Sequence, residues 1–318
     1  MDLLADVLAI TRLGSAVLAH AELVAPWGLA IDPIAEAHVH VVQRGTCWLR
    51  TSASKRAVRL DEGDVVLIGS GVGHSLSDHP DTPLAPYRGV LDAMPKRLAR
   101  AQPSPSTTRV LCAKYLFQPV GPHPLAALLP PLVHLRARDG ARHAPLHLLV
   151  ELLAHEASGT HGGSELVVPR LVDTLLVLVV RAWLEEQPAT AGGWFRALRD
   201  PAIARALGLL HQQPEKPWSV AELARRVAQS RATFARRFAS LVGETPVAYL
   251  TRWRLCLAGK LLAETSLSLE EIAPRVGYET AAAFSKAFRR GLAMSPGRYR
   301  ARAMAGASSR LPDNPLRR

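Results

Sequence analysis

The sequence predicts an α+β protein of two domains: a β-rich N-terminal domain followed by helices, and then an all-α domain with two helix-turn-helix units. Three observations support this fold class. One pattern of residues occurs twice near the C-terminus, short β-type segments fill the first third of the chain, and basic charge is concentrated in the last third. The length of 318 residues suits two domains.

The repeat lies between Ser219 and Arg300. Its first copy consists of Ser219, Leu223, Ala224, Val227, Phe234, Phe238, Pro246 and Tyr249, and its second of Ser268, Ile272, Ala273, Val276, Phe284, Phe288, Pro296 and Tyr299. The offset is 49 residues up to the valines and 50 after them, which places one extra residue in the second turn. A repeat at a nearly fixed offset indicates a duplicated supersecondary unit.

Each copy is expected to fold as a helix, a short turn and a second helix. Ser219 and Ser268 are N-cap residues with a glutamate three positions later, the pattern of a capping box. Apolar residues then recur at helical spacing. The second helices are expected from Arg231 to about Leu241, with Gly243 as C-cap, and from Thr280 to about Gly291. In a helix-turn-helix, this second helix enters the DNA major groove.

Charge supports a DNA-binding function. Residues 216–303 hold 16 Lys and Arg against 6 Asp and Glu, a net charge of +10 within a chain whose net charge is +12. A basic surface around two such units is typical of proteins that bind the phosphates of double-stranded DNA. The predicted phosphate contacts, at or near the two second helices, are Ser230, Arg231, Arg237, Arg252, Thr280, Arg289 and Arg290.

Cysteine usage indicates a reducing compartment, and hydropathy argues against a membrane-spanning segment. The three cysteines, Cys47, Cys112 and Cys256, are widely spaced and odd in number, which argues against a disulfide framework. The N-terminus lacks the pattern of a signal peptide. The most apolar stretch, Leu166 to Leu184, carries too many polar groups for a spanning helix. We therefore expect a cytoplasmic protein with no membrane partner.

Four segments of the C-terminal region carry a resemblance to a known family. They are Trp218-Ser-Val-Ala-Glu-Leu-Ala, Ser230-Arg-Ala-Thr-Phe-Ala-Arg-Arg-Phe, Gly277-Tyr-Glu-Thr and Ser295-Pro-Gly-Arg-Tyr-Arg. From Pro201 to Arg300 the chain resembles the AraC/XylS family of transcription regulators. The resemblance implies two units joined by a long linker helix, here Pro246 to Glu264, which places both recognition helices in successive major grooves.

The resemblance also assigns base-facing positions. They are Ala232, Ala235 and Arg236 in the first recognition helix, and Ala281, Ala282, Ser285 and Lys286 in the second. Because the alanine side chain forms no hydrogen bond, we expect base reading chiefly from Arg236 and Lys286, with guanine O6 and N7 as their acceptors. Two residues depart from the family pattern: Pro274 is expected to bend or shorten its helix, and Ala293 stands where the family usually has glycine.

The N-terminal region is expected to be rich in strands. The candidates, separated by turn residues, are Leu23–Ile31, His38–Gln43, Thr46–Thr51, Ala57–Leu60, Val65–Ile68 and Arg109–Phe117. Many short strands at even spacing predict a sandwich or barrel. The cysteines Cys47 and Cys112 lie on such strands and are expected to be small core residues.

Two segments here resemble the cupin motifs. His38-Val-His40 with Arg44 resembles the first motif, and Gly63, Gly71, His74 and Asp78 match the spacing of the second. In metal-binding cupins, a glutamate stands where this chain has Arg44, and a cation cannot ligate a metal. Two alternatives stay open: a barrel that binds only an organic ligand, or a bound divalent metal. The predicted effector-binding residues are His38, His40, Arg44 and His74, and no cofactor is predicted.

Helices are expected from Leu125 to Gln187, including one over Glu165–Gln187. They either cover the barrel or form a homodimer interface. The predicted domains are residues 1–188, a cupin-like effector-binding and dimerisation domain; residues 198–303, the DNA-binding domain; and a disordered tail, 304–318. A hinge is expected at Pro188–Gly193.

These features predict a sequence-specific DNA-binding transcription regulator, controlled by a small molecule or stress signal that the barrel senses. The implied partners are double-stranded DNA, an effector and, for an activator, RNA polymerase. We expect no enzymatic activity. The alternative is a cupin-type metalloenzyme with a basic DNA-binding appendage, which would need the complete metal site that Arg44 interrupts.

Overall fold

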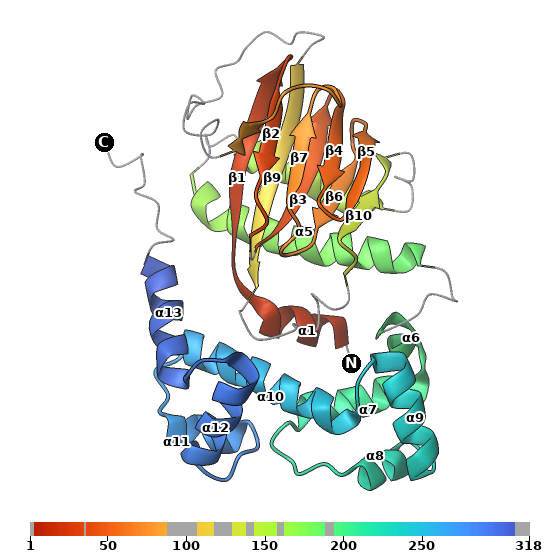
Figure 1. Cartoon of the computed structure of the whole chain (residues 1–318), viewed down its shortest axis with the longest axis vertical. Coiled ribbons are helices and arrows are strands. Elements are labelled where there is room, and N and C mark those ends of the chain that lie inside the picture. The colour runs from red at the N-terminus through yellow and green to blue at the C-terminus, as the bar shows by residue number, and fades with distance from the viewer. Residues whose placement is uncertain are drawn as a thin grey trace. The chain divides into compact units, whose positions relative to one another are not determined.

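The computed structural model describes residues 3–34, 36–87, 107–117, 129–137, 143–157, 162–187 and 194–308 (Figure 1). The chain forms two compact units. The sheet unit comprises Arg12–Phe117 and Leu129–Gln187, and the helical unit joins Met1–Thr11 to the chain from Pro188 onward. The first residues thus group with the helical unit rather than with the predicted N-terminal domain. The predicted hinge, Pro188–Gly193, lies outside the described residues. Among the helices that are described, none is long and apolar enough to cross a membrane.

The sheet unit contains two five-stranded sheets. In order across the sheet, each strand hydrogen-bonded to the next, sheet A consists of β1 (Arg12–Val24), β9 (Thr107–Phe117), β3 (Glu36–Arg44), β6 (Val65–Ile68) and β10 (Leu132–Leu135). Sheet B consists of β5 (Ser54–Leu60), β4 (Cys47–Thr51), β7 (His74–Ser77), β2 (Gly28–Ile31) and β8 (Ala85–Pro86). All pairings are antiparallel except that of β2 with β8. In the described residues no ladder joins the two sheets, so the predicted cupin-like barrel is an open sandwich.

The inner faces of the two sheets share one apolar core. Val42 and Val110 of sheet A belong to the same buried cluster as Leu49 and Leu76 of sheet B. Alternate residues of each strand face inward because side chains alternate across a strand. Cys47 and Cys112 also belong to this cluster, which confirms the prediction that they are core residues.

Two helices cover the outer face of sheet A. They are α4 (Ala144–Ala157) and α5 (Ser164–Glu186), and α5 packs on β1 and β10. The hydroxyl of Tyr115, on the outer face of β9, donates to the carbonyl of Val172 at 2.7 Å. This cover explains why β6 is buried at all four positions and has an unbroken apolar sequence. It also confirms the first of the two roles expected for the long helix.

Several strands differ from the expectation. The predicted strand Leu23–Ile31 is divided into β1 and β2, because Pro26 has no amide hydrogen to give to a ladder. The sequence analysis missed β7 and β10, which are only four residues long. Strands this short carry too little alternation to be recognised, and β10 lies where helix was expected.

The helical unit follows the predicted repeat closely. Its helices are α1 (Leu3–Thr11), α6 (Trp194–Arg199), α7 (Pro201–Gln212), α8 (Val220–Arg226), α9 (Arg231–Val242), α10 (Pro246–Glu264), α11 (Leu269–Arg275), α12 (Ala281–Leu292) and α13 (Pro296–Ser308). The side chains of Ser219, Ser230, Ser268 and Thr280 each accept from the backbone N–H three residues later. This confirms Ser219 and Ser268 as N-caps, whereas Thr280, expected as the first residue of its helix, is the N-cap of α12.

Both copies of the repeat are built on the same aromatic triplet. Phe234 and Phe238 meet edge to face with ring centroids 5.7 Å apart, and Tyr249 packs edge-on against Phe238 at 5.9 Å. In the second copy Phe288 lies 5.5 Å from Phe284 and 5.4 Å from Tyr299. The four phenylalanines are fully buried. The duplicated sequence is therefore a duplicated core, in which edge-to-face pairs add to area burial.

Two expectations for the second copy meet different outcomes. Pro274 lies in α11 without shortening it, because α11 and α8 both contain seven residues. Its side chain is exposed, and so is Glu270, whose carbonyl lacks a bond because proline has no N–H.

The tail prediction was wrong for residues 304–308, which continue α13 to Ser308, and residues 309–318 lie outside the described part.

Ala293, the second departure, lies in the left-handed region with φ 53° and ψ 18° at the end of α12. Its counterpart Gly243 has φ 85°. A left-handed conformation costs a residue with a Cβ about 1–2 kcal/mol, while glycine loses more entropy on folding.

We therefore expect Ala293→Gly to stabilise the helical unit by about 0.5–1 kcal/mol. The matched control is Ala283→Gly, an exposed position inside α12, which should destabilise it by about 1 kcal/mol. Denaturant unfolding of the full-length protein, followed by tryptophan fluorescence, measures both changes. Equal destabilisation by the two glycines would contradict the conformational explanation.

Candidate nucleic-acid interface and ligand-binding residues

The linker helix α10 holds the two halves of the helical unit together through Arg254. Its Nε donates to the carbonyl of Pro214 at 2.6 Å, and its Nη2 donates to the carbonyl of Lys216 at 2.9 Å. The same guanidinium lies against Gly277, where an added Cβ would approach it to 2.5 Å. Arg254 thus links the loop before α8 to the turn before α12. This fixes the spacing of the recognition helices from the middle of α10.

A second buried group attaches α7 and α1 to the same helix. The ring of His211 stacks on Trp253 with centroids 3.6 Å apart, and its Nε2 lies 2.6 Å from the hydroxyl of Tyr249. Its Nδ1 lies 3.3 Å from Asp6 of α1. Burial, helped by Arg252, lowers the pKa of His211 to about 3, so the ring is neutral. We assign Nδ1–H as donor to Asp6 and Nε2 as acceptor from Tyr249.

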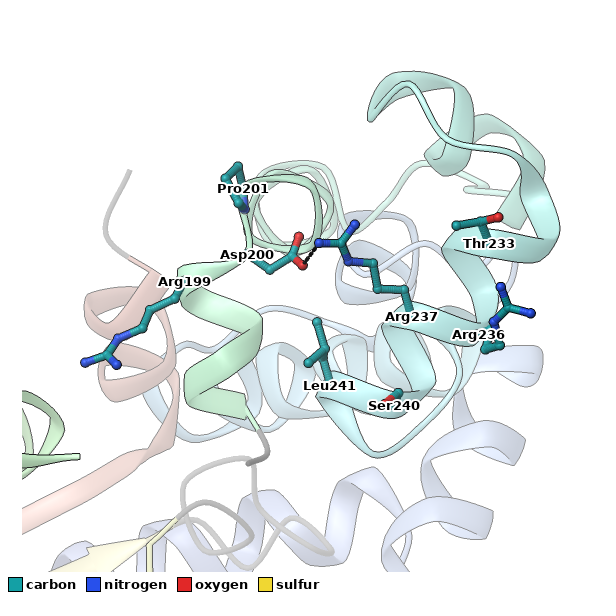
Figure 2. Close-up of a pocket in the computed structure, with 8 residues that line it drawn as sticks. All are labelled: Arg199, Asp200, Pro201, Thr233, Arg236, Arg237, Ser240 and Leu241. Atoms are coloured by element: carbon teal, nitrogen blue, oxygen red, sulfur yellow. Dashed lines mark ion pairs between the residues drawn. The ribbon is translucent and has the colours of Figure 1, made fainter. Parts of the chain in front are cut away.

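Helix α9 presents the first set of predicted DNA contacts. Ala232 and Arg236 are exposed and Ala235 is half-buried, on the face opposite the buried phenylalanines. Figure 2 shows Arg236 pointing away from α7, while Arg237 points toward Asp200, the N-cap of α7. The guanidinium of Arg237 lies 2.5 Å from the Asp200 carboxylate. Both arginines line a cavity of about 620 Å³ between α9 and the start of α7.

Helix α12 presents the second set. Ala282 and Lys286 are exposed, and Ala281 and Ser285 are half-buried. A hollow of about 390 Å³ is lined by five residues, Ala282, Ser285, Lys286, Arg289 and Arg290. Three predicted base-facing positions and two predicted phosphate contacts therefore lie on one surface.

The predicted phosphate contacts differ in their surroundings. Arg237 pairs with Asp200, and Arg252 pairs with Glu244, its Nε lying 3.0 Å from that carboxylate. Among the ion pairs of the described residues, none involves the exposed Arg231, Arg289 or Arg290. Ser230 and Thr280, which serve as N-caps, place their hydroxyl groups at the exposed starts of α9 and α12.

The predicted effector residues only partly come together. His38, His40 and His74 converge between the sheets, with ring centroids 5.0–6.0 Å apart. Arg44 lies four residues beyond His40 on β3, past an irregularity in the ladder and opposite Arg109. At about 3.3 Å per residue this is roughly 13 Å along the strand.

Two of these histidines, His40 and His74, form a hydrogen-bonded chain with Cys112. His40 Nε2 lies 2.8 Å from His74 Nε2, and His40 Nδ1 lies 3.0 Å from the Cys112 sulfur. Burial raises the pKa of Cys112 to about 12, so it is a thiol, and lowers the pKa of His74 to about 3. Burial and the neighbouring histidines also hold the pKa of His40 well below its usual value. We assign Cys112 as donor to His40, and His40 as donor to His74.

This arrangement does not fit a metal ion. Two nitrogens bound to a tetrahedral zinc ion lie roughly 3.3 Å apart, whereas the two Nε2 atoms share a hydrogen bond. No group of three or more His, Cys, Asp or Glu residues in the described part could hold a metal. The remaining positions of the second cupin motif have structural roles: Gly63 and Gly71 adopt positive φ, and Asp78 accepts from Trp27 N–H and from Thr82.

Four residues that contact these sites were missed by the sequence analysis: Asp200, His211, Arg254 and Tyr87. Asp200 before Pro201 was recognisable as a helix start, but not as the partner of Arg237. The hydroxyl of Tyr87 is buried and has no partner in the described residues. Burial raises the pKa of Tyr87, and Cys112 and Glu36 add to the rise. Such pairings depend on long-range packing, which leaves no local pattern in the sequence.

The pair of Asp200 and Arg237 leads to a prediction for DNA binding. Asp200→Asn keeps an N-cap at α7 but removes the charge that holds Arg237. The released guanidinium should then reach a phosphate, and each added phosphate contact steepens the dependence of log K on log salt by about 0.9. Fluorescence anisotropy with promoter DNA between 50 and ~200 mM salt measures this slope.

The control for net charge is Glu264→Gln, which removes one acidic group near the far end of α10. It should leave the slope unchanged, and Asp200→Asn combined with Arg237→Gln should return the slope to the wild-type value. An unchanged slope in Asp200→Asn alone would show that Asp200 does not withhold Arg237 from DNA.

Comparison with known proteins identifies the family of each domain. A cupin family matches residues 2–185, and a helix-turn-helix domain family matches residues 223–302. An AraC-like transcription regulator of Streptomyces lividans is 34% identical over 94% of this chain and 98% of its own. The regulator AlkR of Acinetobacter baylyi is 32% identical over 75% of this chain and 79% of its own.

A solved structure, the DNA-binding domain of AdpA in complex with a target DNA, is 37% identical. It covers 34% of this chain and 97% of that chain, with a TM-score of 0.32. The family matches and the full-length relatives agree on one assignment: the chain belongs to the AraC-like transcription regulators, with an N-terminal cupin domain and a C-terminal helix-turn-helix domain that binds DNA.

Proposed function

We propose that this regulator reads a bipartite DNA site through α9 and α12 and that a small molecule bound in the sheet unit controls it. The observation that carries the DNA part is the pair of exposed recognition helices on identical aromatic cores, spaced by α10 and Arg254. Because α10 has 19 residues, it spans about 28 Å. Adjacent major grooves on one face repeat about every 34 Å.

Base reading rests on Arg236 and Lys286, because the other exposed predicted positions offer little hydrogen bonding. Arg236 is exposed, points away from Asp200 and has no ion pair in the described residues. A guanidinium can donate two bonds to guanine O6 and N7. Arg231 is exposed at the start of α9, and its proposed contact is a phosphate of the DNA backbone rather than a base.

The cupin domain is proposed to bind an organic effector without a metal and without catalysis. The histidine chain supports this reading, because it already satisfies the nitrogens that a metal would need. The three imidazoles are buried, and the buried hydroxyl of Tyr87 has no partner among the described residues; a few polar groups beside an apolar core are typical of small-molecule sites. The relatives are transcription regulators, which favours this function over the metalloenzyme alternative.

Two further partners are proposed: a second copy of this chain and RNA polymerase. Leu148 and Leu152, one turn apart on α4, are exposed and suit a homodimer contact. An activator would also contact RNA polymerase. Because its target is chromosomal DNA, the protein should act in the cytoplasm.

Arg236→Ala should weaken binding to the cognate promoter by about 1–3 kcal/mol and relax preference at one base position. The matched variant is Arg231→Ala, which should weaken all sites equally and reduce the salt slope by about 0.9. Both are measured with full-length protein against a library of promoter variants. Uniform loss across the library for Arg236→Ala would place its contact on the DNA backbone.

Control by the cupin domain is tested by comparing full-length protein with residues 195–318 fused to an unrelated dimeriser. Promoter activity driven by the full-length protein should change across a panel of small organic compounds, and activity driven by the fusion should not. Identical responses of the two proteins would rule out a sensing role for the sheet unit.

A further inference from the structure

The open edge of the sandwich contains a cavity that is separate from the histidine chain. It measures about 580 Å³, which is within the range for small-molecule sites. Its lining comes from β4 and β5, from the turn after β5, and from β10 with the residues that follow. Strand β5 is the edge of sheet B and β10 is the edge of sheet A (Figure 1). The cavity therefore lies at the seam where the sandwich is not closed.

The wall formed by β10 is fixed by one buried carboxylate. Asp64 accepts from His134 Nε2 at 2.7 Å, from the N–H of Ala137 at 2.8 Å and from the N–H of Asp61 at 3.1 Å. Burial alone would raise the pKa of Asp64, but these hydrogen bonds lower it, so the group is a carboxylate. Because His134 and Ala137 are both held, Arg136 between them has a fixed backbone position at the rim.

The charges at the rim favour an anion. Arg59 is already paired with Asp61 at 3.0 Å, and the acceptors of Asp64 are occupied by three donors. Arg56 and Arg136 line the cavity and take part in none of the ion pairs between described residues. One comes from the edge of sheet B and the other follows the edge of sheet A, so an anion between them would connect the two sheets. Guanidinium groups bind carboxylates in a bidentate manner.

The rest of the lining is apolar. Trp48, Val58 and Ala137 are its apolar lining residues, so its occupant needs an apolar body as well as an anionic group. One residue of the cavity wall, His134, lies on the same face of sheet A as His40. His134 is opposite Val66, and Val66 is opposite His40, so both imidazoles lie on the same face two strands apart.

From these observations we infer that the seam between β5 and β10 is the binding site for a small organic carboxylate, whose charge is held by Arg56 and Arg136 and whose apolar body lies against Trp48 and Val58. This rests on the proposed control by a small molecule and assigns it a place and a chemical class. It moves the anion contact from Arg44, the residue that the cupin spacing suggested, to two arginines that no motif marks.

The test uses full-length protein and 2-naphthoate, a fluorescent carboxylate with a flat apolar body. Binding is measured by fluorescence titration for the wild type, for Arg56→Gln with Arg136→Gln, and for a charge-matched control, Arg44→Gln with Arg50→Gln. The seam variant should bind at least tenfold more weakly than the wild type, and the control should match the wild type. The neutral analogue naphthalene-2-carboxamide should bind the wild type at least tenfold more weakly than the acid.

Equal affinity of the wild type and the seam variant, or loss of binding only in the Arg44 control, would overturn the assignment. So would amide binding as tight as that of the acid, or no naphthoate binding at millimolar concentration. Competition by inorganic phosphate at equal concentration would show a phosphate site and overturn the carboxylate assignment. Promoter affinity is measured in parallel: naphthoate binding that follows the arginines but leaves DNA affinity unchanged would support the seam site and contradict the proposed control.

Discussion

The packing around α10 is the constraint on which DNA recognition depends. A protein that reads two grooves at once must keep its two recognition helices, α9 and α12, at a fixed distance. The helix between them, α10, has buried residues along most of its length. Arg254 donates to two carbonyls of the loop before α8 and packs against the turn before α12, so its planar guanidinium joins opposite halves of the unit. Gly277 contributes to this contact, since a Cβ at this position would lie 2.5 Å from that guanidinium. The turn chemistry and the arginine therefore constrain each other.

The sequence predicted the helical unit well because its signals are local and occur twice. The serine caps, the phenylalanine pairs and the bounds of α10 all follow from spacing within one element. Ala293 was even recognisable as a strained position, and its φ of 53° confirms this. Local spacing did not predict the surroundings of Arg237. Its position in the first recognition helix suggested a phosphate contact, but its guanidinium pairs with Asp200, which lies 37 positions earlier in the chain.

The sheet unit was less predictable because its function depends on pairings between distant strands. The cupin spacing correctly brought His38, His40 and His74 together, yet it also suggested Arg44, which the strand carries away from them. The partner of His40 is Cys112, 72 positions away, and the sequence marked that residue only as a small core side chain. A buried imidazole chain is costly unless every nitrogen is satisfied, and the thiol supplies the last bond. These polar groups are therefore a fixed network rather than vacant ligands.

The two units share one covalent connection that has no intervening linker. Helix α1 ends at Thr11 and β1 begins at Arg12, so the helix that touches His211 is continuous with an edge strand of sheet A. Within the helical unit α1 packs on α7 and α10, with Leu3 and Val7 buried and Asp6 about two-fifths exposed. For a ligand in the sheet unit to change DNA binding, it must bind two states of the protein unequally. Control of DNA binding therefore requires states of the protein that differ both in affinity for the ligand and in the groove spacing that α10 sets.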